Sequence, residues 1–192
     1  MSETDFLAWI DRHVYAEWVD GKVELMSPVN IGHAEISQWL AAILHVYCRR
    51  KQLGVVISAE VMVRLDAVPS RRIPDLMFID AARRKIMKPT HIEGAPDLIV
   101  EIVSPDSVSR DWGRKFREYE DAGVREYWIV DPLSKIFESH SLQSSGKYAR
   151  ITERDGRIFS QVIKDFYLRP SWFWMVPLPD ELKVLKELGV RS

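Results

Sequence analysis

Glu101 stands inside an otherwise apolar stretch, "PDLIVEIVSPD", over residues 96–106. The run predicts a strand buried on both faces, where an ionised carboxylate is costly without a partner. The helix expected over residues 107–122 offers one. At about 100° per residue, Lys115 falls inside the apolar arc of this helix, which consists of Val108, Trp112, Phe116, Tyr119 and Ala122. A helix that folds back on its own strand would place Lys115 against Glu101.

Two accounts fit this pair of charges. The first is a buried salt bridge between Glu101 and Lys115. The second adds Asp75, which follows Pro74 at the start of another predicted strand. Two carboxylates on neighbouring strands and one lysine would suit magnesium-assisted hydrolysis of phosphodiesters, because magnesium prefers hard oxygen ligands and needs only one or two protein carboxylates. The metal would activate water, and the lysine would orient the nucleophile or stabilise developing charge.

The elements that must position these residues follow from turn signals and apolar patterns. A short helix begins after Ser2 or Thr4, and its apolar side is formed by Phe6, Leu7 and Ile10. Asp20 and Gly21 lie between two strand-like runs and predict a hairpin. The next helix is expected over residues 32–50, with a buried side formed by Ile36, Leu40, Ile43, Leu44 and Tyr47.

The remaining pattern is dominated by strands. Residues 54–65 alternate apolar and polar side chains and predict one half-buried strand. Further strands are expected at 75–79 and 125–132, then a hairpin over 135–152 and an aromatic tail with a short final helix. The central order helix, strand, strand, strand, helix, strand indicates a mixed sheet flanked by helices, of α/β or α+β class.

Composition excludes several classes of protein. The chain has 192 residues, of which 46% are hydrophobic and 29% charged, as in a soluble globular domain. A net charge of −1 gives no overall basic signature, so nucleic-acid binding would need a local patch or bound cations. The single cysteine, Cys48, excludes an intrachain disulfide framework and is expected as a buried apolar residue. The sequence begins without a targeting pattern and has no membrane-spanning apolar run, so a cytoplasmic location is expected.

Three segments carry a resemblance to a known family. "RIPDLMFID", "GAPDLIVEIVSPDS" and "DWGRKFREYEDAGVREYWIVDP", in this order, closely resemble the Uma-two family of putative restriction endonucleases, within the PD-(D/E)XK nuclease superfamily. The likeness extends from about Trp18 to Pro179 and is most specific between Ala95 and Pro132.

The resemblance implies roles for individual positions. Asp75 is similar to the acidic residue of the PD element, and Glu101 to that of the (D/E)XK element. Both would be ligands of magnesium or manganese, and the backbone carbonyl of Ile102 would be the third ligand that the protein supplies. The sequence departs from the superfamily pattern at Val103, where that pattern has lysine. Family members resemble this chain in carrying the lysine on the following helix, which implies a catalytic role for Lys115.

Other polar residues have both a functional and a local interpretation. Glu60 could hold a metal-bound water or a second cation, or be a surface carboxylate. His33 lies on the flank of its helix and is a better-placed helper than Glu35, which points away, although it could simply bond locally. Asp111 lies one turn before Lys115 and could orient it or form an ordinary (i, i+4) pair. Asp97 also follows a proline, but it lies four positions before Glu101 on the same strand, roughly 13 Å away, so a strand-start role is favoured.

Basic residues could supply the local patch that the net charge does not show. They are Arg83, Arg84, Lys85 and Lys88, in a run just after the strand of Asp75. Such a run is often only a solvated loop, but beside a metal site it could grip phosphates. Arg114 lies on a solvated or ligand-facing edge of its helix.

Together these observations predict one domain over residues 1–192. Its nuclease-like core would cover about 31–132, with an N-terminal helix and hairpin at 2–28 and C-terminal strands and helix at 135–190. The expected activity is cleavage of DNA, most simply double-stranded and by a homodimer, because two antiparallel strands suit two related sites. The alternatives are a catalytically silent nuclease-like module for DNA or protein binding or dimerisation, and an active site directed at branched DNA or RNA.

Overall fold

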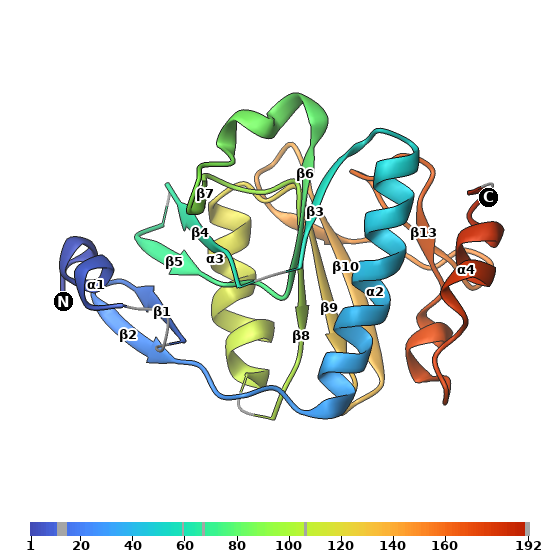
Figure 1. Ribbon diagram of the computed structural model, residues 1–192, viewed down its shortest axis with the longest axis horizontal. Coiled ribbons are helices and arrows are strands. Elements are labelled where there is room, and N and C mark those ends of the chain that lie inside the picture. Colours follow the sequence, from blue (N-terminus) through green and yellow to red (C-terminus); the bar gives the residue numbers. More distant parts are fainter. Residues whose placement is uncertain (11–14, 59, 67, 106, 191–192) are drawn as a thin grey trace.

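The computed structural model describes residues 1–10, 15–58, 60–66, 68–105 and 107–190. A six-stranded mixed sheet forms its centre, with helices on both faces (Figure 1). The strand order is β11 (Tyr148–Arg150), β10 (Ile136–Leu142), β9 (Glu126–Asp131), β8 (Leu98–Ile102), β6 (Leu76–Asp80) and β3 (Gly54–Ile57). β8 and β9 are parallel, and every other neighbouring pair is antiparallel.

Alternation along the strands divides the sheet into two faces. Even-numbered residues of β6 and β8, such as Leu76 and Val100, join the core beneath helix α2 (Ile31–Arg50). Odd-numbered residues, such as Met77 and Ile99, join a second core beneath helix α3 (Phe116–Asp121). Glu101 therefore points from β8 toward the α3 side.

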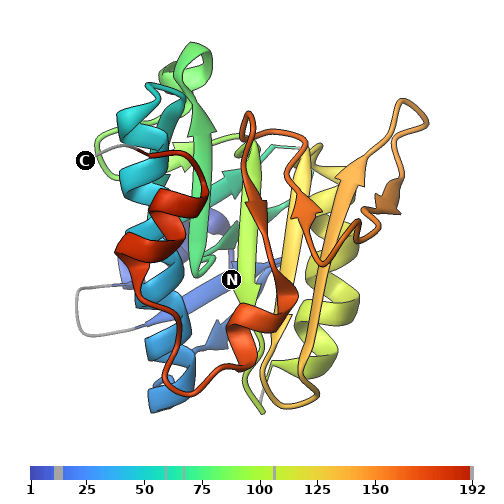
Figure 2. The same ribbon diagram turned by 90° about the vertical axis from the view of Figure 1, so that its right-hand side faces the viewer.

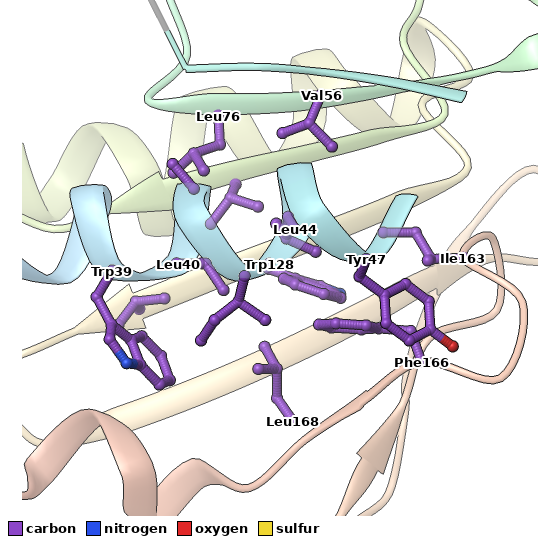
Figure 3. Close-up of a cluster of buried hydrophobic side chains, with 14 of the residues drawn as sticks. Trp39, Leu40, Leu44, Tyr47, Val56, Leu76, Trp128, Ile163, Phe166 and Leu168 are labelled. Carbon is purple, nitrogen blue, oxygen red and sulfur yellow. The ribbon is translucent and has the colours of Figure 1, made fainter. Parts of the chain in front are cut away.

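The core beneath α2 is rich in aromatic side chains (Figure 3). Phe166 packs between Trp128 and Tyr47, with ring centroids 6.1 Å and 4.9 Å away. The C-terminal segments that close this face are β12 (Ile158–Phe159), β13 (Tyr167–Leu168), η3 (Pro170–Trp174) and α4 (Glu181–Glu187), seen in front of the sheet in Figure 2. The aromatic packing expected of the tail is confirmed, because Trp172 and Phe173 are buried.

A smaller sheet lies on the α3 side. Its order is β2 (Lys22–Leu25), β1 (Ala16–Val19), β5 (Ser70–Arg72), β4 (Met62–Leu65) and β7 (His91–Glu93). The predicted hairpin is confirmed: β1 and β2 are antiparallel, and Asp20 and Gly21 have φ of 47° and 79°, as a tight primed turn requires. Helix α1 (Glu3–Trp9) begins at the Ser2 cap and buries Phe6, but Leu7 is exposed rather than part of the apolar side.

The predicted single strand over residues 54–65 is wrong. The structure has β3 in the central sheet and β4 in the smaller sheet, with the described residues between them outside any strand. Alternation of apolar side chains identifies extended backbone but not its partner. Here one half pairs with β6 and the other with β5 and β7.

The helix after β8 has an unexpected winding. Residues 108–121 are helical, but Arg110–Lys115 (η2) forms a π-helix that continues into α3. A π-turn closes on i+5 instead of i+4, so positions before it lose the α-helical phase. Val108, expected on the buried arc, is accordingly 40% exposed, whereas Lys115 is buried as predicted.

The expectations for helix α2 and for Cys48 are confirmed. The five residues expected on the buried side of α2 are all buried, as is Cys48. Among the described residues, no helix is both long and apolar enough to cross a membrane.

Candidate active site

Asp75 lies just before β6 and Glu101 lies in the neighbouring strand β8, at one end of the central sheet. Leu76 pairs with Val100, so continuing this antiparallel register by one position sets Asp75 opposite Glu101. Asp75 Oδ2 accepts a 2.7 Å hydrogen bond from the backbone N–H of Ile102 and lies 3.2 Å from His33 Nε2. The start of β6, the end of β8 and the start of α2 therefore meet at the Asp75 carboxylate.

Lys115 is the partner of Glu101 that the sequence predicted. Its Nζ lies 2.9 Å from Glu101 Oε1, and the same oxygen accepts a 2.6 Å hydrogen bond from the Tyr119 hydroxyl. Glu101 and Lys115 are 3% and 1% exposed, so neither charge has water as its main partner. The strand and the helix that follows it fold against each other as their spacing indicates.

Further carboxylates surround the Lys115 ammonium. Asp111 Oδ1 is 3.4 Å away and Glu17 Oε1 is 3.7 Å away. Burial would lower the pKa of Lys115, but the negative charges of Glu101, Glu17 and Asp111 outweigh it and raise that pKa above its usual value. Lys115 therefore stays protonated at neutral pH.

Burial and neighbouring charges also shift the pKa values of Glu101 and Asp111. Burial raises the pKa of Glu101 to about 8; Lys115 opposes this rise, while the charges of Asp111 and Asp75 add to it. The pKa of Asp111 is also raised, chiefly by burial. Burial and the neighbouring carboxylates thus disfavour ionisation of Glu101, and a further cation beside it would favour the ionised form.

A small cavity opens beside the cluster. Its volume is about 70 Å³, enough for a few waters or an ion. The polar residues of its lining are Tyr15, Ser27, His33, Asp75, Glu101, Ser104, Ser107, Arg110, Asp111 and Lys115. A broader hollow of about 680 Å³ shares Tyr15, His33 and Asp75 with it and also contains Glu60. Glu60 is exposed, whereas Glu35 is exposed and lines neither space.

Asp97 lies at the other end of β8 from Glu101, as expected of a strand-start residue. Its carboxylate accepts hydrogen bonds from Asp80 N, Arg83 and Arg125, at 2.8 Å, 2.8 Å and 3.0 Å. Asp97 is completely buried and does not line the cavity. Asp97 therefore links the end of β6, helix η1 and the residue before β9, at the opposite end of the sheet from Glu101.

The structure does not bring the predicted basic run to the cavity. Three of its residues lie in the 3₁₀ helix η1 (Ala81–Ile86), which begins after β6 ends, whereas Asp75 precedes β6. A five-residue strand separates them by roughly 17 Å. Arg83 is held by Asp97 and the carbonyl of Ala95, and Arg84, Lys85 and Lys88 are exposed. The run therefore lies at the opposite end of β6 from Asp75, and its binding of phosphates stays a prediction. Arg114 is exposed and pairs with Glu24.

Sequence reasoning missed two buried charges and one hydroxyl group that support the candidate site. Glu17 and Arg72 are each completely buried, and Tyr119 supplies a hydroxyl to Glu101. Glu17 carried a usable signal, because it interrupts the apolar run "YAEWV" just as Glu101 interrupts its strand. Arg72 carried none, since its stretch, "SRRIP", has the composition of a turn.

No group of three or more His, Cys, Asp and Glu side chains in the described part of the chain is arranged to hold a metal ion. The cavity lining nevertheless suits a hard cation, because it includes the carboxylates of Asp75 and Glu101 and also Ile102, whose backbone carbonyl would supply a third oxygen. Magnesium completes its shell with water, so two protein carboxylates suffice.

The fold is of the mixed α+β, restriction-endonuclease-like class that the sequence predicts. It matches the crystal structure of a putative nuclease belonging to DUF820 from Anabaena variabilis ATCC 29413, with a TM-score of 0.75 and 16% identity, over 91% of this chain and 97% of that one. Residues 4–168 match the Uma2 family, described as "putative restriction endonuclease", and the chain belongs to that family. No curated protein matches it.

Proposed function

We propose that this protein is a metal-dependent endonuclease that hydrolyses DNA phosphodiester bonds, with Asp75, Glu101 and Lys115 at its active site. The observation that carries the proposal is that Asp75, Glu101 and Lys115 line one cavity, with the Lys115 ammonium 2.9 Å from Glu101. Family membership implies a nucleic-acid substrate. We further propose that the substrate is DNA, that the protein acts as a homodimer and that it is located in the cytoplasm.

Asp75, Glu101 and the carbonyl of Ile102 would hold magnesium or manganese. When bound, the ion would activate water for attack and offset charge on the scissile phosphate. Lys115 stays protonated and would stabilise the negative charge that develops on phosphorus oxygens. His33 fixes the Asp75 carboxylate, and Asp111 helps to hold Lys115. Glu60, in the adjoining hollow, would bind a second cation or a water.

The overall reaction adds water to phosphorus and breaks one P–O bond. Cleavage is expected to break the bond to the 3′ oxygen, which takes a proton and leaves as a hydroxyl, while the 5′ oxygen keeps the phosphate. Arg110 is placed to contact the substrate, because it lines the cavity and its Nε is buried without a hydrogen-bond partner among the described residues.

The second candidate is a silent nuclease-like module. It is favoured by the mutual pairing of Glu101, Lys115 and Tyr119, which satisfies these groups without a cation. Metal binding distinguishes the nuclease from the silent module, because a structural ion pair between Glu101 and Lys115 needs no metal ion.

The test combines calorimetric titration with Mn²⁺ and nicking of supercoiled plasmid and single-stranded DNA. We expect the wild-type protein to bind Mn²⁺ and cleave DNA, and Asp75→Asn and a chelator to abolish both. Asp80→Asn, at the other end of the same strand, is the matched control and should retain both. Wild-type protein that neither binds Mn²⁺ nor cleaves would favour the silent module.

A further inference from the structure

Glu17 is a buried acid supplied by the N-terminal hairpin. Its side chain is completely buried in β1, and both oxygens are engaged. Oε1 accepts a 2.8 Å hydrogen bond from the backbone N–H of Ile73 and lies 3.7 Å from Lys115 Nζ. Oε2 accepts a 2.7 Å hydrogen bond from Arg72. The Glu17 carboxylate thus contacts the Ile73 backbone, the Lys115 ammonium and the Arg72 guanidinium.

The sheet register explains how Glu17 arrives there. Trp18 of β1 pairs with Arg71 of β5, so the next position sets Glu17 opposite Arg72. The chain then runs through Ile73 to Asp75. Glu17 consequently holds the backbone that leads into Asp75 and the ammonium that pairs with Glu101.

Glu17 does not itself face the substrate. It is absent from the residues that line the cavity or the adjoining hollow. Its Arg72 partner is equally buried and also contacts Glu24 and Glu118, at 3.0 Å and 2.8 Å. Glu17 is therefore a support behind Lys115 and the segment before Asp75, not a ligand of metal or DNA.

We propose that Glu17 is a positioning residue of the active site, through which the N-terminal hairpin fixes the Lys115 ammonium and the segment that presents Asp75. This inference rests on the proposed nuclease function. It implies that the hairpin completes the catalytic centre, although the residues that would touch substrate lie elsewhere in the chain.

Glu17→Gln is the informative substitution. Glutamine keeps the volume and a carbonyl oxygen for the Ile73 N–H, but it removes the charge that faces Lys115. We expect the turnover number for DNA cleavage with Mn²⁺ to fall between about tenfold and hundredfold, as small displacements of catalytic groups do, while KM changes less than about twofold.

Glu118→Gln is the matched control. It removes a charge from the same buried Arg72 but has no contact with Lys115 in the described structure. Both variants are assayed well below their melting temperatures. Glu118→Gln should keep the wild-type turnover number, whatever its loss of thermal stability.

Equal losses of turnover in the two variants, or none in Glu17→Gln, would overturn the inference, because Glu17 would then be only one member of a structural network. If Glu17→Gln does not fold, Glu17→Asp keeps the buried charge but shortens its reach, and it should lower turnover with KM unchanged. Wild-type protein without Mn²⁺ binding or cleavage would instead reject the proposed function, and this role with it.

Discussion

The backbone N–H of Ile102 donates a 2.7 Å hydrogen bond to Asp75 Oδ2, which ties the end of β8 to the residue just before β6. The bond draws the Asp75 carboxylate across the strand pair, next to Glu101. It also holds the peptide group between Glu101 and Ile102 in place. The local geometry of the proposed metal ligands is thus set by strand pairing and not by mobile loops.

Replacing Lys115 separates a catalytic from a structural role. Lys115→Met leaves three buried carboxylates facing an apolar side chain, and removing one partner of a buried pair costs about 3 kcal/mol of folding free energy. Lys115→Met combined with Glu101→Gln removes both charges of the closest pair and should recover part of that loss. We expect DNA cleavage to be absent in both variants, measured beside urea unfolding. Cleavage by folded Lys115→Met at the wild-type rate would assign Lys115 a structural role only.

The strand and helix around Glu101 could be predicted because the signals are local. Glu101 and Lys115 belong to consecutive elements, and an alternation or helical period reports which face each occupies. The π-turn altered the phase at Val108 but left Lys115 buried. The basic run lies away from Asp75 for a geometric reason: β6 stands between Asp75 and Arg83, so the two residues lie at opposite ends of the sheet.

Residues brought in by long-range pairing were harder to predict. Glu17 meets Arg72 only because β1 pairs with β5, and no local pattern reports which edge a hairpin joins. The same is true of the division of residues 54–65 between two sheets. Buried ionic contacts of this kind depend on topology, which the order of elements in one sequence leaves open.

Arg110 is expected to contribute affinity without catalysis. It lines the cavity from η2, and a guanidinium there would pair with a backbone phosphate of DNA. Arg110→Gln should weaken DNA binding and make the slope of log K against log salt shallower by roughly 1, the value for one phosphate contact. Fluorescence anisotropy with Ca²⁺ in place of Mn²⁺ would measure this. Arg117→Gln, exposed on the same helix, is the control, and an equal effect of both changes would exclude a specific contact.

His140 should make stability depend on pH. Burial, supported by Arg150 and opposed by Glu138, lowers the pKa of His140 below its usual value. The unfolded chain therefore binds a proton more readily, so stability falls as pH decreases through about 6.5 toward the folded-state pKa. His140→Gln should show a smaller drop in melting temperature between pH 7 and pH 5.5 than the wild type. An unchanged drop would mean that other groups control acid sensitivity.

Phe166 is expected to be a main contributor to the stability of the α2 face. The ring is completely buried and packs against Tyr47 and Trp128 (Figure 3). Phe166→Ala should lower the free energy of unfolding by about 3–5 kcal/mol, because it deletes a large buried ring and leaves a cavity. Phe159→Ala, where the ring is 39% exposed, should cost much less. Urea unfolding followed by tryptophan fluorescence compares the two variants. Similar losses would show that the C-terminal segments pack on the sheet too loosely for burial at Phe166 to matter.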